Sequence, residues 1–305
     1  MKSRRQDRSH VARLPGRGSE GFSSPSDLAG WPGVLSVVIP AKDEAESLPQ
    51  LVAEIVASLR PLMAKQRAKA SPGLAGFEIV LVDDGSTDET AVVLRRLAAE
   101  YPELRPVRLG SNVGQSAATA AGFRLARGEW VATLDADLQN DPADLAVLWE
   151  ALGDAQVALG WRRKREDVWS KRVISRCANR VRNAVLGQSI RDTGCSVRIF
   201  RREMALRLPI FRGCHRFFGP LLLREGCSIV QMPVRHRPRP HGTSHYTLWN
   251  RSIRVVVDLL GVAWLMRRPA RYEVAWVGVE AEPVGESVAT VPAAHLSART
   301  ARREA

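Results

Sequence analysis

Apolar residues along the chain gather in short β-rich runs that alternate with stretches of helical spacing. The apolar runs lie at residues 36–40, 77–84, 105–109, 130–137 and 155–160. The first four runs are followed by helical stretches at about residues 44–69, 89–100, 115–127 and 142–152. Buried strands separated by such helices are typical of a parallel sheet covered on both faces. The pattern predicts a mostly parallel, doubly wound α/β fold, whose ligands bind beyond the carboxyl ends of the strands.

After residue 160 the alternation is less regular. Helices are predicted at residues 169–186 and 217–225, strands at 196–202 and 228–236, a loop at 237–246, and a further helix from Leu248 to Met266. The predicted domains are a flexible basic arm at 1–33, the α/β domain at 34–246, an amphipathic helix at 247–268 and a disordered tail at 269–305.

Charge divides the α/β domain into two halves. The 305 residues carry 45 Lys and Arg against 32 Asp and Glu, a formal net charge of +13. Residues 34–159 hold 11 basic and 18 acidic side chains, whereas residues 160–254 hold 22 and 5. The chain therefore joins an acidic half to a strongly basic one, and a basic excess of this size is typical of contact with nucleic acid or a membrane surface.

Several function classes are excluded by composition and motifs. A hydrophobic fraction of 45% excludes wholesale disorder, and four cysteines without C-x-x-C spacing exclude a disulfide scaffold. No strand is followed by G-x-G-x-x-G or a P-loop, so neither a dinucleotide oxidoreductase nor a P-loop NTPase is supported. Nucleic-acid binding stays an alternative for the basic half. We do not expect it, because that half lacks a nucleic-acid motif and the acidic clusters would serve no purpose.

Membrane contact is predicted at the surface of the bilayer. The amino terminus has basic residues without an apolar segment behind them, so we expect no signal peptide. The most apolar stretch, 255–266, has 12 residues and contains Asp258, whereas a spanning helix needs about 20. Arg251, Arg254, Arg267 and Arg268 flank it, as expected of a helix lying in the plane of an anionic membrane. The alternative is a core helix with ordinary charged ends. We expect a cytoplasmic protein, peripheral to the membrane.

Two clusters of carboxylates follow predicted strands. Asp135 and Asp137, with Gln139, offer the oxygen ligands that Mg²⁺ or Mn²⁺ prefers. The alternative is a solvated turn that caps the next helix. Asp83 and Asp84 follow another buried strand, and helix capping needs only one such side chain. Both could accept hydrogen bonds from a base or a ribose.

Four ordered motifs carry a family resemblance. They are VVIPAKDEAESL, VLVDDGSTDET, NVGQSAATAAGFRLARGEWVATLDADLQNDP and HRPRPHGTSHY. Over about residues 34–260 the chain resembles glycosyltransferase family 2, and within it the polyprenyl-phosphate glycosyltransferases of the dolichol-phosphate mannosyltransferase type. The resemblance implies a GT-A fold with a nucleotide-sugar and divalent-metal site. Its nucleotide-sugar residues would be Pro40, Lys42, Glu44, Asp83, Asp84, Asp135 and Arg239, and its metal ligands Asp135, Asp137 and Gln139.

The resemblance also implies that 34–159 is the nucleotide-sugar and metal half of the domain and that the basic residues 160–246 form its acceptor half. Acceptor phosphate would meet Arg162, either Lys171 or Arg172, and Ser175, while Arg237, Arg239, Gly242 and Ser244 belong to a late loop over the sugar and phosphates. The residues assigned to the transfer step are Asp137, Arg162, Ser175 and Arg237. Two positions depart from the family pattern. Cys195-Ser196-Val197 replaces Ser-Gly-Phe, and His245 replaces a lysine.

The resemblance implies an inverting transfer of a sugar from a nucleotide sugar to a polyprenyl phosphate at the membrane surface. Mannose from GDP-mannose is the first expectation. The alternatives are glucose or a modified arabinose from a UDP-sugar to undecaprenyl phosphate, and a soluble glycan acceptor. The sequence does not specify the sugar, the polyprenol or the oligomeric state.

Overall fold

A computed structural model describes residues 30–67, 73–163, 179–238 and 248–268. Its centre is a seven-stranded sheet in the order β3-β2-β1-β4-β6-β5-β7. The strands are β1 (Trp31–Ala41), β2 (Gly76–Asp83), β3 (Leu104–Arg108), β4 (Gly128–Thr133), β5 (Val157–Arg162), β6 (Arg198–Arg201) and β7 (Ile229–Val234). All run in the same direction except β6, which pairs antiparallel with both β4 and β5. The prediction of a mostly parallel, doubly wound sheet is confirmed.

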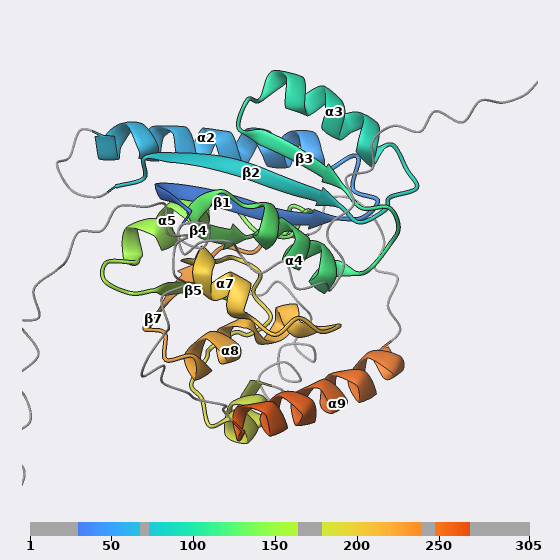
Figure 1. Cartoon of the computed structure of the whole chain (residues 1–305), viewed down its shortest axis with the longest axis vertical. Helices are drawn as coiled ribbons and strands as arrows, with labels where there is room; N and C mark the ends of the chain where they lie inside the picture. Colours follow the sequence, from blue (N-terminus) through green and yellow to red (C-terminus); the bar gives the residue numbers. More distant parts are fainter. Residues whose placement is uncertain (1–29, 68–72, 164–178, 239–247, 269–305) are drawn as a thin grey trace, which may run out of the picture. The chain divides into compact units, whose positions relative to one another are not determined.

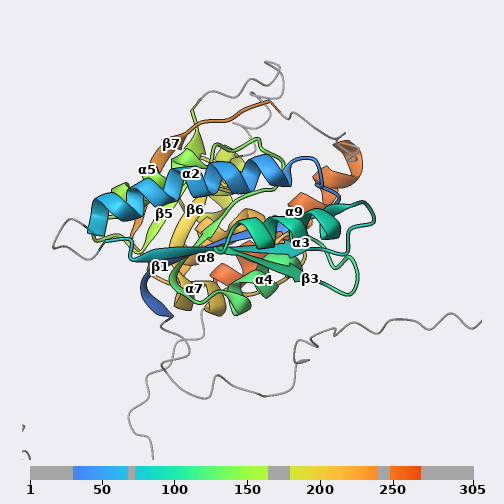
Figure 2. The ribbon, with the colours of Figure 1, turned by 90° about the horizontal axis from the view of Figure 1, so that it is seen from above.

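Helices cover both faces of this sheet (Figure 1). One face packs against α2 (Leu48–Arg67), α3 (Thr90–Glu100) and α5 (Ala143–Ala151). The other packs against α4 (Gln115–Leu125), α7 (Arg202–Arg207), the 3₁₀ helix η1 (Cys214–Phe217) and α8 (Phe218–Arg224), and α9 (Leu248–Met266) adds Val262 and Ala263 to the same core. The view from above shows α2 and α3 on the near side of the sheet and α4 and α7 beyond it (Figure 2).

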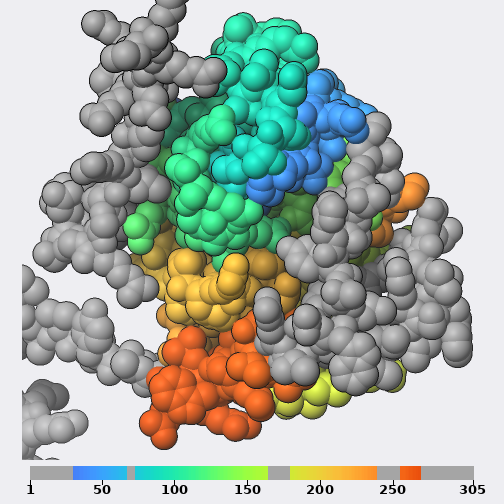
Figure 3. Space-filling view, turned by 90° about the vertical axis from the view of Figure 1, so that its right-hand side faces the viewer, coloured from blue at the N-terminus to red at the C-terminus, as the bar shows by residue number. Residues whose placement is uncertain are grey.

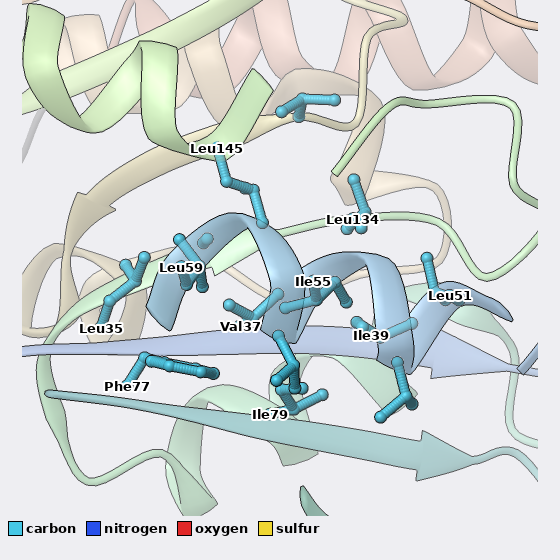
Figure 4. Packing of buried hydrophobic residues seen from close by; sticks show 14 of the residues in the cluster. Leu35, Val37, Ile39, Leu51, Ile55, Leu59, Phe77, Ile79, Leu134 and Leu145 are labelled. Carbon is cyan, nitrogen blue, oxygen red and sulfur yellow. The ribbon is translucent and has the colours of Figure 1, made fainter. Parts of the chain in front are cut away.

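The central strand β1 is buried on both sides because its alternate side chains enter two different cores. Leu35, Val37 and Ile39 point to the α2 side, where Figure 4 shows them packed beneath the α2 side chains. The α2 residues labelled there are Leu51, Ile55 and Leu59. Val38 enters the opposite core, next to α4. Gly122 of α4 lies so close to β1 that a Cβ at this position would collide with Val38. This close approach fixes α4 on the sheet.

Three features of the fold differ from the sequence expectations. β1 begins at Trp31, inside the predicted arm, because Trp31 already pairs with Gly128 of β4. The predicted strand 196–202 is shorter, and its last residue, Arg202, starts α7. β6 also runs against its neighbours, which residue patterning cannot reveal. Of the predicted helix 169–186, the described part is helical from 179 to 186 and the rest lies outside the described residues.

Candidate functional site

The candidate site lies at the carboxyl ends of β1, β2 and β4. From β1 the chain passes outward to β2 and β3, and then returns to place β4 on the other side of β1. The strand order therefore reverses between β1 and β4, and ligands of open α/β sheets bind at such reversals. The loops that follow β1, β2 and β4 carry most of the residues predicted for nucleotide and metal binding.

The loops after β1 and β2 are tied together by hydrogen bonds. The Asp43 carboxylate accepts from the Thr87 N–H (2.7 Å), and the Asp43 N–H donates to Ser86 Oγ (2.9 Å). Lys42 lies 2.8 Å from Asp43 and donates to the Gly85 carbonyl (3.2 Å). The Lys42 hydrogen bond is the main cause that lowers the pKa of Asp43 to about 2. Two of the motif-bearing loops thus form one preassembled wall.

Asp83 and Asp84 both hold backbone of the same region. Asp83 is fully buried, and its Oδ1 accepts from the Ser86 N–H at 2.8 Å. Its Oδ2 lies 3.5 Å from Nε of Arg108 and accepts no hydrogen bond from the described residues. Asp84 accepts from the N–H groups of Val113 (2.7 Å) and Gly114 (2.9 Å), just before α4. Both aspartates therefore stabilise the backbone of these loops. Their contact with a base or ribose stays a prediction.

Asp135 and Asp137 stand directly after β4. Asp135 Oδ1 accepts from Nε2 of Gln115, the first residue of α4, at 2.9 Å. Burial and then the nearby Asp137 carboxylate raise the pKa of Asp135. The described residues contain no group of three or more His, Cys, Asp or Glu placed to hold a metal. Two carboxylates that leave further positions to phosphate and water fit Mg²⁺ or Mn²⁺.

The loop between these aspartates and α5 has an unusual backbone. Leu138 has a φ of 59°, uncommon for a residue with a branched side chain. Its side chain is buried in the α2-side core, which holds the turn in place. The Gln139 N–H donates to Asp137 Oδ1 (3.2 Å), and the Gln139 carbonyl accepts from the Arg237 N–H (2.7 Å). The predicted metal ligands therefore lie on a fixed loop.

Arg162, predicted to bind acceptor phosphate, is engaged by a carboxylate. Its Nε and Nη2 donate to the two oxygens of Asp192, at 2.7 and 3.0 Å. The pair is mostly buried, with side chains 13% and 10% exposed. Next to it, buried Arg198 donates to the carbonyls of His215 and Thr193, and burial lowers its pKa. The structure places Arg162 beside the carboxylate site, with its charge already paired.

Cys195 and Ser196 occupy the departure from the family pattern. Burial raises the pKa of the Cys195 thiol to about 11, so it is an inert core thiol. Ser196 Oγ accepts from Asn140 Nδ2 at 2.8 Å, and it also hydrogen bonds to Asp135. The departure thus lines the base of the carboxylate site.

Arg237 braces two helices. Its Nη1 lies 2.7 Å from Glu54 of α2, and its Nη2 lies 3.0 Å from Asp141, just before α5. Burial works to lower the Arg237 pKa, but the bonds to Glu54 and Asp141 outweigh it and raise the pKa. Arg235 makes parallel pairs with Asp141 (3.0 Å) and Asp144 (3.2 Å). The predicted residues Lys171, Arg172, Ser175, Arg239, Gly242, Ser244 and His245 lie outside the described residues.

Sequence reasoning missed several contacts around Asp135. Gln115 and Ser196 contact its carboxylate, and Asp192 holds Arg162. The only sequence signal for Gln115 was its place in the NVGQSAATAAG motif, and nothing marked it as a partner of Asp135.

The last described helix, α9, has two different faces. Val262 and Ala263 are buried against the domain. On the other side Val256, Val257, Leu260 and Trp264 are each more than half exposed, and Figure 3 shows the helix at the surface. Within the described ranges no helix has the length and apolar character needed to cross a bilayer. The inner face packs as the core-helix alternative expects, and contact of the outer face with a membrane stays a prediction.

Comparisons with known proteins show the family of this chain. The model of the family described as "Glycosyl transferase family 2" matches residues 36–208. The chain is 36% identical to the dodecaprenyl-phosphate galacturonate synthase of Rhizobium johnstonii, over 78% of this chain and 68% of that protein. It is 37% identical to the undecaprenyl-phosphate 4-deoxy-4-formamido-L-arabinose transferase of Edwardsiella ictaluri, over 74% of this chain and 66% of that one. The chain thus spans about two thirds of the length of these relatives.

Solved structures support the fold. The mannosyltransferase PcManGT of Pyrobaculum calidifontis, in complex with GDP-Man and Mn²⁺, has a TM-score of 0.55 at 22% identity, over 78% of this chain and 65% of that one. The glucosyl-3-phosphoglycerate synthase of Mycobacterium tuberculosis, in complex with Mn²⁺, UDP and phosphoglyceric acid, has a TM-score of 0.54 at 22% identity, over 75% and 78%. This likeness shows the GT-A fold, as predicted.

Proposed function

The chain belongs to glycosyl transferase family 2, and we propose that this glycosyltransferase moves a sugar from a nucleotide sugar to a polyprenyl phosphate. The observation that carries the proposal is that this chain is 36% identical to the dodecaprenyl-phosphate galacturonate synthase over 243 residues. The carboxylate pair Asp135 and Asp137 at the strand reversal supports the same reaction, because it stands where a nucleotide diphosphate would be expected.

The sugar we propose differs from the first expectation. The two relatives are named for galacturonate and for a formamido-arabinose, and neither name includes mannose. They favour the alternative stated from the sequence, glucose or a modified arabinose transferred from a UDP-sugar to undecaprenyl phosphate, and the first relative adds galacturonate to the candidate sugars. GDP-mannose becomes the second candidate.

The donor diphosphate would bind with a divalent cation. Asp135 and Asp137, with Gln139, offer oxygen ligands, and bound Mg²⁺ or Mn²⁺ would stabilise negative charge on the departing diphosphate. Pro40, Lys42, Glu44, Asp83 and Asp84 stand on or after β1 and β2, which supports a nucleotide pocket there.

The transfer is a single inverting displacement. An oxygen of the lipid phosphate attacks C1 of the sugar, the bond between C1 and the β-phosphate oxygen breaks, and that electron pair leaves with the nucleoside diphosphate. The second pKa of a phosphate monoester is about 6, so the acceptor is mostly ionised near neutral pH and needs no strong general base. The role of this chain is therefore to bind and orient the two substrates and to neutralise the charge of their phosphates.

On the acceptor side we retain Lys171 or Arg172, Ser175 and Arg239 as proposed phosphate ligands. Arg162 and Arg237 enter the proposal with carboxylate partners. We propose that Arg162 meets the acceptor phosphate as part of its pair with Asp192, and that Arg237 contributes its charge from between α2 and α5. A paired arginine can still direct a hydrogen bond to phosphate, because a guanidinium has five N–H donors.

Access to a lipid acceptor would come through α9. We propose that Val256, Val257, Leu260 and Trp264 enter the membrane interface on the cytoplasmic side, with Arg267 and Arg268 among the anionic headgroups. Leu260→Glu with Trp264→Glu should abolish flotation with vesicles containing anionic lipid. Glu46→Ala, an exposed change elsewhere, serves as the control. Flotation of the double variant equal to that of the original protein would contradict the membrane role of this face.

The test of function is a donor panel. The purified full chain is incubated with Mn²⁺ and with either undecaprenyl phosphate or a short water-soluble glycan. Each mixture receives UDP-galacturonate, UDP-4-deoxy-4-formamido-arabinose, UDP-glucose or GDP-mannose, and the product is identified by mass spectrometry. We expect product with a UDP-sugar. Product with GDP-mannose alone would restore the first expectation, and transfer only to a water-soluble glycan would replace the lipid acceptor. Salt-sensitive RNA or DNA binding, without any transfer, would favour the nucleic-acid alternative.

A further inference from the structure

The amino end of α4 is held from two sides. On one side Asp84 accepts hydrogen bonds from the two residues that precede the helix. On the other side Ser116 Oγ lies 2.8 Å from Nδ1 of His215 and accepts from the Gly213 N–H at 3.0 Å. Ser116 is 5% exposed, so its hydroxyl is largely shielded from water and bonds to these two groups. His215 is about 100 residues away in sequence, on η1, and belongs to none of the motifs.

Gln115 connects this end of α4 to the carboxylate site. It precedes Ser116 in the first helical turn, and its side chain donates to Asp135 Oδ1. The Gln115 side chain is exposed, so packing does not fix where its amide lies. Its position therefore depends on the helix backbone, which Ser116 and His215 hold.

The segment around His215 is held by groups from other elements of the fold. The Arg198 guanidinium donates to the His215 carbonyl at 2.8 Å. Gly213, two residues earlier, has a φ of 94°, and a Cβ there would come 2.7 Å from the Asp258 carboxylate of α9. The segment that carries His215 is thus held between a buried arginine and the last helix, and the histidine ring has a defined place.

We propose that His215 and Ser116 are positioning residues, which act through Gln115 to hold Asp135 for the divalent metal. The inference rests on the proposed function, because it takes Asp135 as a metal ligand. Two neighbouring carboxylates repel each other, so a ligand carboxylate needs partners that set its orientation before the cation arrives. Outer partners of metal ligands typically change metal affinity by about 10–100-fold when they are removed.

The experiment measures Mn²⁺ affinity of the full chain by electron paramagnetic resonance, with UDP or GDP present, whichever supports tighter binding. Gln115→Ala and His215→Ala should each weaken Mn²⁺ binding by roughly 10-fold or more. His215→Asn should bind nearly as the original protein does, because an asparagine amide can take the place of Nδ1. Arg212→Ala, an exposed change on the segment before η1, is the matched control and should leave the affinity unchanged.

The double variant tests whether His215 acts through Gln115. If it does, the double variant Gln115→Ala with His215→Ala should bind Mn²⁺ no more weakly than Gln115→Ala alone. A loss of affinity in the double variant equal to the product of the two single losses would overturn the inference. In turnover, the single variants should raise the Mn²⁺ concentration needed for half-maximal rate while kcat at saturating Mn²⁺ recovers.

Two further outcomes separate the failures. Unchanged Mn²⁺ affinity in His215→Ala, with normal binding by the original protein, overturns the inference and leaves the proposed function standing. Absence of Mn²⁺ binding in the original protein overturns the metal assignment and this inference together. If His215→Ala does not fold, Gln115→Ala still tests the last link, since its side chain is exposed, and unchanged Mn²⁺ affinity in that variant overturns the inference.

Discussion

The two halves of the α/β domain use charge in different ways. In residues 34–159, the aspartates of the first two strand ends accept hydrogen bonds from backbone N–H groups and so build the loops. In residues 160–254, several buried or half-buried arginines pair with side-chain carboxylates or backbone carbonyls. Arg162 holds Asp192, Arg198 holds two carbonyls, and Arg237 holds Glu54 and Asp141.

The net charge of a region therefore differs from the charge that its side chains can offer to a ligand. The basic excess of the second half suggested that its arginines face phosphate. Several of them instead stabilise the fold, including Arg237, which crosses from the second half to a helix of the first. In the first half Asp135 and Asp137 are the aspartates that we propose as cation ligands. Asp135 has its partners on side chains rather than on backbone, so its environment can be changed without undoing a loop.

The largest effect is expected where the acidic half meets a ligand. Asp137→Ala should lower sugar transfer by more than about 100-fold, because removal of a ligand should cost more than removal of its outer partner. The fold should persist, since Asp137 is not part of the cores. Turnover across a Mn²⁺ titration, with circular dichroism as the control for folding, makes the measurement. Near-normal turnover would mean that the two halves do not divide metal and acceptor as proposed.

A stability effect of similar weight is expected from the pair Arg162 and Asp192. Asp192→Ala leaves a mostly buried guanidinium unpaired, and breaking such a pair costs about 3–5 kcal/mol, here nearer the lower end because both side chains retain some exposure. Urea unfolding measures it. The double variant Arg162→Met with Asp192→Leu should recover most of the loss. If Asp192→Ala unfolds like the original protein and changes only KM for the lipid acceptor, Arg162 serves the ligand and not the fold.

A smaller effect is expected at Arg237. Its side chain is 36% exposed, so the loss of its bonds to Glu54 and Asp141 should destabilise the protein by about 1 kcal/mol in Arg237→Ala. Arg60→Ala, which removes a more exposed arginine that pairs with Glu103, is the matched control and should cost less. Urea unfolding and transfer rates are measured on both. Unchanged stability together with a transfer rate lowered more than 10-fold would assign Arg237 to the diphosphate, as the family resemblance implies.

Sequence reasoning reached the parts of this molecule that depend on neighbours in sequence. The strands from β1 to β5 follow from apolar runs, and the carboxylates after β2 and β4 lie at one edge of the sheet because parallel strands end at the same edge. It did not reach β6, whose reversed direction depends on the strands on both sides. Nor did it reach the contacts of Gln115 with Asp135 or Arg162 with Asp192, since the partners are 20 and 30 residues apart. No periodicity encodes such pairs, because tertiary packing alone brings them together.

The smallest effect is expected from Asp43, which ties two loops of the acidic half. Its pKa of about 2 lies below the value near 3.9 of an unfolded chain, so its contribution to stability is complete above pH 4 and is lost as pH falls through 2. The side chain is 42% exposed, so the contribution at neutral pH should stay below about 1 kcal/mol. Urea unfolding of the original protein and Asp43→Asn at pH 7, 4, 3 and 2 should show a gap in unfolding free energy that closes between pH 4 and 2. A gap that persists unchanged at pH 2 would mean that the carboxylate charge of Asp43 does not tie these loops, and the preassembled wall would then rest on the hydrogen bonds of Ser86 and Thr90.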